Sequence, residues 1–394
     1  MNKLSIPNKL IYLNFVLIPI VAFLKITIGI SAYFIYQLLI TIVVIKNINK
    51  LNGIKSKTNI LLFLFLLFYC SLSLPTYMDY IYNWLGMVFL LLVYSFQWFI
   101  IASMNNNWEE LLNFMRKRKY VLFIPNIILL LYEYHVGRTM LGNMEISYSI
   151  LPPAIFSAYD VLKSKSFKNI LYFASSTVLI FLVGSRGPLL CIFAFIILYS
   201  LLQSKFKVKI LISILLIFSA FIVFRTDTLQ TFRNTLAEHN IYSRTLDKFL
   251  TGSISDDTGR SKIQKIVIED LNNNLITGTG IGGERIKINF ERYDMKKDMS
   301  SCYPHNLILE ILVHYGMIVG TTIIITICIL SIKAFKKGRS QERDMIIIIF
   351  SMEIVRLFIS SSYTMSPLFF LYLGLIYSII KRSGKNEICN NLTQ

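Results

Sequence analysis

The residues best suited to chemistry form the segment Tyr303–Asn306, where a long polar stretch meets an apolar run. Histidine titrates near neutral pH, so His305 at a water–lipid boundary can accept a proton from a hydroxyl group. Glu310 follows five residues later and is expected, with Asn306, to orient the imidazole. The sequence leaves a second interpretation open, in which His305 only caps or anchors the helix that follows.

Two arginines are candidates for binding phosphate oxygens. Arg186 lies between two apolar runs in the segment Gly184–Pro188, where glycine and proline interrupt the helix and free backbone N–H groups. Arginine is costly in hydrocarbon and tends to face a cavity or a partner, and a guanidinium beside free N–H groups suits an anion. Arg260 precedes a predicted helix whose dipole also favours negative charge. The alternatives are a snorkelling arginine at a tight turn for Arg186 and a solvated surface residue for Arg260.

Other features carry weaker signals. The segment Gly278–Gly283 is glycine-rich but lacks the preceding strand and βαβ setting of a dinucleotide-binding loop, so we predict a turn that passes close to other backbone. Glu353 and Arg356 stand three residues apart in an apolar run and predict an intrahelical ion pair. Around His305 the sequence shows no HExxH motif and no paired carboxylates, and the five cysteines of the chain lack paired spacing. We therefore predict neither a metal site nor a disulfide framework.

The composition identifies an integral membrane protein. Of the 394 residues, 55% are hydrophobic and 16% are charged, and the mean hydropathy is +0.59. The apolar residues form runs close to the ~20 residues that a helix needs to cross a bilayer. We predict an all-α polytopic membrane protein with ten to twelve transmembrane helices. The predicted spans are 10–25, 27–45, 58–76, 81–103, 119–136, 147–162, 169–184, 188–203, 209–225, 306–332, 344–362 and 366–381.

The basic residues indicate the orientation of these spans. The net charge is +18, but Lys and Arg gather in short clusters at alternate loops, as the positive-inside rule requires of cytoplasmic loops. The basicity therefore predicts topology rather than nucleic-acid binding. Both termini are then cytoplasmic, and residues 226–305 form one large extracytoplasmic loop with eleven basic and eleven acidic residues.

This topology divides the chain into three parts. Residues 1–225 hold about nine N-terminal spans, and residues 306–394 hold about three spans and a cytoplasmic tail. The loop between them, 226–305, is long for a compact membrane protein, and such loops are usually functional. One face of a helix within it is predicted to consist of Ile263, Ile266, Ile268 and Leu271.

The ordered motifs resemble the O-antigen ligase/polymerase superfamily, which comprises Wzy-type polysaccharide polymerases and lipopolysaccharide O-antigen ligases. The matching pieces are GSRGP at Gly184–Pro188, TGR at Thr258–Arg260, GTGIGG at Gly278–Gly283, and PHN with LE inside Pro304–Gly316. The motifs cover roughly residues 170–320. Elsewhere only the layout is similar, with many spans, basic inner loops and a large late external loop.

The resemblance implies a GT-C-like glycosyltransferase of the bacterial cytoplasmic (inner) membrane that needs no cofactor, nucleotide sugar or metal. Its expected partners are undecaprenyl-pyrophosphate-linked oligosaccharides as donor and acceptor, membrane lipid, and a chain-length regulator. Two cations would stabilise the growing charge on the pyrophosphate leaving group.

The resemblance also assigns roles to individual residues. Arg186 and Arg260 would hold the donor pyrophosphate. His305 would deprotonate the acceptor hydroxyl, with Glu310 in support. The other expected substrate-binding residues are Ser185, Tyr303 and Asn306.

The expected function is polymerisation of O-antigen, capsule or exopolysaccharide repeat units onto the hydroxyl of a lipid-linked acceptor. One alternative is an O-antigen ligase that moves finished glycan to lipid A core or protein, since the motifs are shared. A second alternative is a flippase or transporter for lipid-linked glycan, which would need a polar pathway through many spans. Few charges lie within the predicted spans, and polar residues gather at one outer face, which favours an enzyme.

Overall fold

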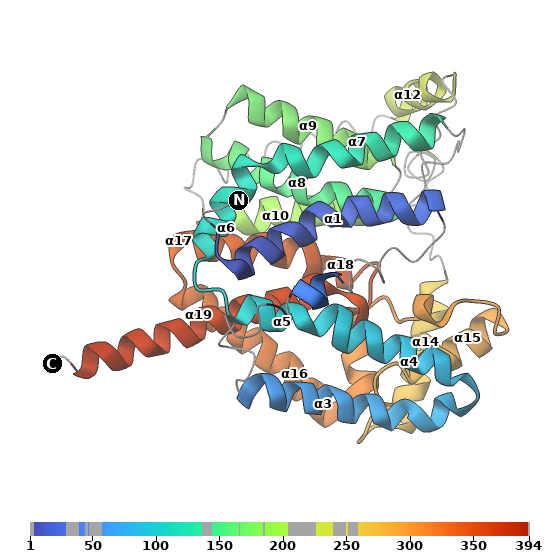
Figure 1. Cartoon of the computed structure of the whole chain (residues 1–394). Helices are drawn as coiled ribbons and strands as arrows, with labels where there is room; N and C mark the ends of the chain where they lie inside the picture. Colours follow the sequence, from blue (N-terminus) through green and yellow to red (C-terminus); the bar gives the residue numbers. More distant parts are fainter. Residues whose placement is uncertain are drawn as a thin grey trace.

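The computed structural model describes residues 4–28, 39–43, 46, 57–135, 144–164, 166–183, 186–203, 226–238, 250 and 259–392. Every regular element within these residues is helical, and they contain no strand (Figure 1). The α-helices are α1 (Ile6–Ile28), α3 (Lys57–Ser73), α4 (Ile81–Phe89), α5 (Phe96–Ser103), α6 (Trp108–Lys117), α7 (Lys119–His135), α8 (Met144–Ser164), α9 (Phe167–Leu182), α10 (Arg186–Gln203), α12 (Thr226–Glu238), α14 (Arg260–Asn273), α15 (Glu284–Tyr293), α16 (Leu307–Lys337), α17 (Ser340–Ile349), α18 (Val355–Leu357) and α19 (Pro367–Leu392).

Short turns of tighter or wider helix join several of these elements. The 3₁₀ turns are η1 (Leu74–Tyr80), η4 (Met299–Ser301) and η6 (Tyr363–Met365), and the π-helical turns are η2 (Leu90–Ser95) and η5 (Phe350–Ile354). At η1 the chain reverses direction, so that α3 and the α4–α5 segment lie side by side as a helical hairpin (Figure 1).

The helices occupy the positions of the predicted spans. The predicted spans within the described residues fall on helices, but 344–362 is divided among α17, η5 and α18 and its last five residues are not helical. The spans 209–225 and most of 27–45 lie outside the described residues. Among the described residues, three helical stretches are long and apolar enough to cross a membrane, namely Lys57–Ser103, Arg186–Gln203 and Leu307–Lys337, and α7 and α9 are shorter apolar helices. These stretches support a membrane protein, but they do not confirm the predicted twelve crossings.

The helices form two neighbouring layers (Figure 1). Helices α7, α9 and α10 pack around α8, while α19 packs between α5 and α16. Both layers share one apolar interior, which includes the fully buried Trp98 and Trp108. The indole nitrogen of Trp108 donates a hydrogen bond of 2.8 Å to the Ser378 hydroxyl, so this buried polar atom is satisfied.

A second, smaller core lies under α14. Ile263, Val267 and Leu271 are buried against α15 and α16, and Ile266 packs at their edge. The predicted amphipathic face is therefore correct for Ile263, Ile266 and Leu271. It is wrong for Ile268, which is 46% exposed, because Val267 occupies the inward position one residue earlier.

The long helix α16 is interrupted at Gly316. This residue has φ 75° and ψ 171°, a backbone region that only glycine adopts readily. In a continuous helix the amide of Met317 would bond to the carbonyl of Val313, but it donates to the Leu275 carbonyl at 2.8 Å instead. The released Val313 carbonyl accepts the amide of Thr279 at 2.8 Å.

The glycine-rich segment fits into this interruption. A Cβ at Gly278 would lie 2.5 Å from the Gly316 amide nitrogen, and one at Gly280 would lie 2.5 Å from the Ser73 amide nitrogen. The amide of Ile281 donates to the carbonyl of Tyr69 at 2.9 Å. The predicted turn that passes close to other backbone is thereby confirmed.

We expect Gly278→Ala to lower the melting temperature of the detergent-purified protein. Its φ of 69° costs a residue with a Cβ roughly 1–2 kcal/mol, and the overlap with the Gly316 backbone adds to this cost. Gly86→Ala is the control, because no atom lies within 4 Å of its added Cβ, and it should leave the melting temperature unchanged or slightly higher. Equal melting temperatures for the two variants would contradict the close approach.

Candidate functional site

The segment Tyr303–Asn306 forms a rigid turn ahead of α16. His305 has φ 56°, in the left-handed region, and its ring lies 4.3 Å from the Tyr303 ring. The Tyr303 hydroxyl donates to the Ser360 carbonyl at 3.0 Å. The Asn306 side chain accepts the amides of Ile308 and Leu309 at 3.0 and 3.2 Å, so Asn306 caps the helix. The capping role that the sequence left open for His305 thus belongs to its neighbour.

His305 stands in a partly buried, cationic environment. Burial, together with the charges of Arg260 and Lys297, lowers the pKa of His305 to about 4. Its Nδ1 atom is buried and has no hydrogen-bond partner among the described residues. The imidazole is therefore neutral near pH 7 and has a ring nitrogen available to accept a proton.

Arg260, the first residue of α14, also contributes positive charge at His305. It follows Gly259, whose φ of 80° sets the turn into the helix. Burial raises the pKa of Tyr303, and the charges of Arg356 and Arg260 act on the same hydroxyl. The charges of four cations, Arg260, Lys297, Arg285 and Arg356, therefore act on the Tyr303–His305 pair.

Arg356 enters from the other side. Its guanidinium lies 4.4 Å from the centre of the Tyr148 ring and 3.6 Å from Glu353, so the predicted intrahelical pair is present. The Nε atom of Arg356 is buried and has no hydrogen-bond partner among the described residues. The Ser360 amide donates to the Arg356 carbonyl at 2.9 Å, which ties Arg356 to the residue that holds Tyr303.

The start of α10 joins this neighbourhood through Tyr148. The Tyr148 hydroxyl is hydrogen-bonded to the Ser360 side chain and lies against Gly187, where a Cβ would overlap it. Arg186 is the first residue of α10 and immediately precedes Gly187. Contacts thus run from His305 through Tyr303, Ser360 and Tyr148 to the beginning of α10. Ser185 lies outside the described residues.

Glu310 has different partners from those the sequence predicted. It is fully buried and accepts from the Ser362 hydroxyl and from the Tyr363 amide at 3.3 Å, with no bond to His305 among the described contacts. Arg285 donates to the Ser362 and Thr364 hydroxyls at 3.0 and 2.8 Å. Glu310 therefore fixes the loop after α18, and that loop carries the Ser360 carbonyl that Tyr303 needs.

His314, one turn after Glu310, extends this buried network. Its Nδ1 lies 2.6 Å from the Tyr363 hydroxyl and its Nε2 lies 2.8 Å from Glu284. Burial raises the pKa of Glu284, but His314 and Arg285 outweigh burial and lower it overall. The carboxylate is thus ionised, and the network joins α15 and α16 to the loop after α18.

The same residues are the only metal-ligand group found in the described part of the chain. Ligand-type atoms of Glu284, Glu310 and His314 lie within 4.8 Å of one another, and all three side chains are buried. Arg285 has its Nε 3.8 Å from Glu284 and supplies positive charge beside the two carboxylates. We interpret the group as a charge-compensated hydrogen-bond network that positions the candidate site.

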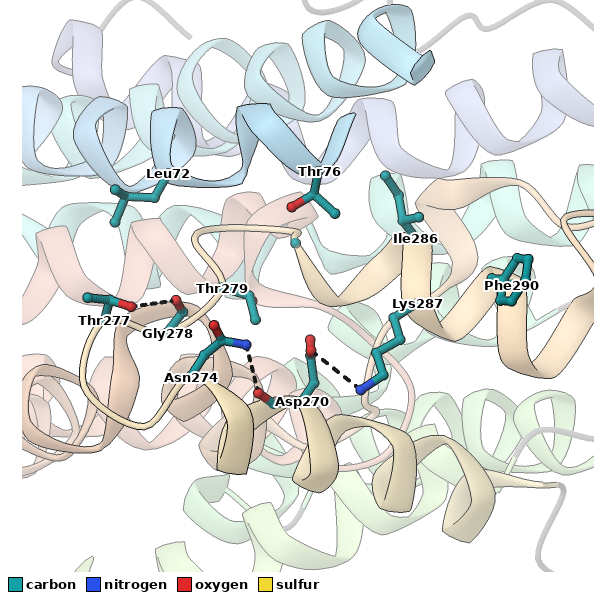
Figure 2. Close-up of a pocket in the computed structure, with 11 residues that line it drawn as sticks. Leu72, Thr76, Asp270, Asn274, Thr277, Gly278, Thr279, Ile286, Lys287 and Phe290 are labelled. Carbon is teal, nitrogen blue, oxygen red and sulfur yellow. Dashed lines mark hydrogen bonds and ion pairs between the residues drawn. The ribbon is translucent and has the colours of Figure 1, made fainter. Parts of the chain in front are cut away.

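A pocket of about 540 Å³ lies beside this network (Figure 2). Its polar wall includes the 3.6 Å ion pair between Asp270 and Lys287. Burial raises the pKa of the Asp270 carboxyl. The residues around it are Leu72, Thr76, Asp270, Asn274, Thr277, Gly278, Thr279, Gly283, Ile286, Lys287 and Phe290. Asn274 is 14 residues beyond Arg260, about 20 Å along α14. The pocket is therefore separate from the cations around His305.

Sequence reasoning missed several residues of this region. The sequence predicts Arg356 only as half of an ion pair, because spacing within one helix says nothing about the neighbouring helix that supplies Tyr148. Lys297 and Ser360 carry no motif. Arg285 follows Glu284 directly after the glycine-rich segment, and this charged pair beside a close backbone approach was the available signal.

Comparison with known proteins bears on the central part of the chain. Residues 171–325 match the family described as O-antigen ligase (Wzy_C). The matched segment contains Arg186, Arg260, Tyr303 and His305, and it ends within α16. No curated protein matches the chain. The match covers 155 of the 394 residues and supports the resemblance to the O-antigen ligase/polymerase superfamily that the ordered motifs predicted.

Proposed function

We propose that this protein is a polysaccharide repeat-unit polymerase that transfers glycan from an undecaprenyl-pyrophosphate donor to the hydroxyl of a lipid-linked acceptor. The observation that supports this proposal best is the neutral, partly buried His305 with arginines around it. A neutral imidazole is the form that accepts a proton, and the cations suit a pyrophosphate leaving group.

The reaction follows from these two properties. The acceptor oxygen bonds to the anomeric carbon of the donor sugar while the bond from that carbon to the pyrophosphate oxygen breaks. His305 takes the hydroxyl proton, and Arg186 and Arg260 bind the undecaprenyl pyrophosphate that leaves, with Arg356 as a further cation. In-line attack inverts the anomeric configuration. Glu310 acts as a positioning residue, through Ser362 and Tyr363.

The proposal includes a topology. About twelve spans in a GT-C-like arrangement would cross the cytoplasmic membrane, with both termini in the cytoplasm. Residues 1–225 and 306–394 would form the transmembrane parts, and 226–305 the external loop. Ser185 and Asn306 remain proposed contacts to substrate beside Arg186 and His305, and a chain-length regulator remains a proposed partner.

The proposal can be tested with lipid-linked glycan extracted from a strain that lacks the gene. Protein reconstituted in liposomes should convert single repeat units into a ladder of longer glycans on the carrier lipid. Transfer of finished glycan to lipid A core or protein, without any ladder, would instead identify a ligase. Movement of the glycan across the liposome membrane without bond formation would identify a flippase.

The pH profile tests the role of His305 separately. We expect kcat/KM to keep nearly its full value from pH 7 down to about 5.5 and to fall around pH 4, because His305 with a pKa of about 4 stays neutral until then. An unperturbed histidine would lose activity around pH 6.5. The profile is measured with the reconstituted protein and lipid-linked repeat units.

Lys297→Gln provides the matched variant for this profile. It removes one of the cations that lower the His305 pKa, so the acidic fall should move to higher pH. Lys296→Gln removes an equally exposed lysine one residue away and should leave the profile in place. Identical profiles for both variants, or a wild-type fall near pH 6.5, would exclude the proposed environment of His305.

A further inference from the structure

A second pocket lies where four helices begin or end. Its volume is about 320 Å³. The ends of α6 and α8 meet the starts of α7 and α9 here. The lining residues are Asn113, Arg116, Lys117, Lys119, Tyr120, Asp160, Lys168, Asn169 and Tyr172.

Positive charge exceeds negative charge in this pocket. Arg116 and Lys119 share one carboxylate, that of Asp160, at 2.6 and 2.5 Å. Lys117 and Lys168 are exposed and form no ion pair with the residues that the structure describes. Four cations therefore line the pocket with a single anion. Like charges held this close favour an anionic ligand.

The backbone adds to this positive potential. Helices α7 and α9 both begin at the pocket, and neither has an acidic residue in its first turn. Ser166, at the N-cap of α9, makes no side-chain capping bond. The positive ends of two helix dipoles therefore point toward the same cavity that holds the four cations.

Apolar surface continues from the pocket along both helices. On α7 the exposed side chains Tyr120, Ile124, Ile128 and Leu131 follow helical spacing, and on α9 Phe167, Leu171 and Val178 do the same. The rings of Phe123 and Tyr172 lie 6.3 Å apart, which joins the two helices near the pocket. An occupant that fits both features has a phosphate at one end and hydrocarbon chains along the helices.

We propose that this pocket binds the phosphate head group of an anionic membrane phospholipid, whose acyl chains lie along α7 and α9. Basic pockets between membrane helices are suited to such head groups. The pocket is at the start of α9, whereas Arg186 follows the end of α9, about 24 Å away along that helix. The site is thus separate from the one proposed for the glycan donor, and its occupant belongs to the opposite membrane surface.

The test uses the full-length protein in detergent and native mass spectrometry. The added ligands are phosphatidylglycerol, phosphatidylcholine, inorganic phosphate and undecaprenyl phosphate. We expect phosphatidylglycerol to bind most tightly. Lys117→Ala and Lys168→Ala should each weaken its binding about five-fold, and the double variant about 25-fold, since a lysine near anionic lipid contributes about 1 kcal/mol. The double variant Lys333→Ala/Lys336→Ala, at the exposed basic end of α16, is the control and should bind as the wild type does.

Each other outcome would overturn the assignment. Equal binding of phosphatidylcholine would show that hydrocarbon alone is recognised. Binding of inorganic phosphate as tight as that of phosphatidylglycerol would indicate a site for free phosphate. Tighter binding of undecaprenyl phosphate would indicate a carrier-lipid site. Unchanged phosphatidylglycerol binding by the Lys117/Lys168 double variant would place the lipid elsewhere.

Discussion

Replacing His305 by glycine should reduce glycan transfer by a factor of about 10² to 10⁴, the range that a positioned general base contributes. Glycine adopts φ 56° without strain, so this variant removes the imidazole while the turn keeps its shape. Alanine at the same position removes the imidazole and adds backbone strain. A melting temperature equal to that of the wild type in His305→Gly would assign the loss to chemistry rather than to unfolding.

The measurement is gel analysis of glycans from a deletion strain complemented with wild type, His305→Gly or His305→Ala. Loss of the ladder, with single repeat units still attached to lipid, would support both a polymerase and a required His305. Long polymer accumulating on the carrier lipid would point to a ligase. An unchanged ladder in both variants would remove His305 from the mechanism.

Arg260→Ala and Arg186→Ala should each reduce transfer about 10²- to 10³-fold, as expected when one group that stabilises transition-state charge is lost. Both residues are proposed to bind the leaving pyrophosphate. Lys262→Ala is the matched control on the same helix, because Lys262 is exposed and only two residues from Arg260. It should retain wild-type transfer.

Single-turnover kinetics with donor-loaded protein would measure this effect directly. A reduced chemical step in the arginine variants, with Lys262→Ala unchanged, would support their role at the leaving group. Equal loss in Arg260→Ala and Lys262→Ala would show that α14 responds to any loss of charge. Wild-type rates in both arginine variants would reject the pyrophosphate assignment.

The helical architecture was predictable because its signal is local. Apolar runs of about membrane length specify helices by themselves, and the apolar runs within the described residues are helical, whereas α6, α12, α14 and α15 lie outside such runs. The interruption at Gly316 was not predictable, since it depends on the Leu275 carbonyl and the Thr279 amide, which lie about 40 residues away in sequence. Length and composition alone therefore suggest one continuous helix through Leu307–Lys337.

The candidate site was predictable only in part, for the same reason. His305, Tyr303, Arg186 and Arg260 stand beside glycine or proline in short motifs, which the sequence displays. The contribution of Arg356 depends on Tyr148, which another helix supplies. For Glu310 the sequence instead predicted a contact that the structure does not contain among the residues it describes. Its proximity to His305 in sequence suggested a contact, but a helix that begins at Leu307 turns Glu310 inward toward Ser362.

The interruption at Gly316 also bears on where the His305 turn lies relative to the hydrocarbon layer of the membrane. After it, the apolar stretch Met317–Ile332 extends for about 24 Å at 1.5 Å per residue, and the side chains of the lysines that follow can reach the head groups, so the stretch spans most of the ~30 Å hydrocarbon layer. Its outward side chains, such as Ile318, Ile325 and Ile329, are exposed and apolar. If this stretch lies in the hydrocarbon, the turn that carries His305 lies on the far side of the Gly316 interruption, beyond the end of the apolar stretch. The polyprenyl-pyrophosphate donor proposed above has its charge at the membrane surface, so its glycan would react there while the isoprenoid tail stays dissolved in the bilayer.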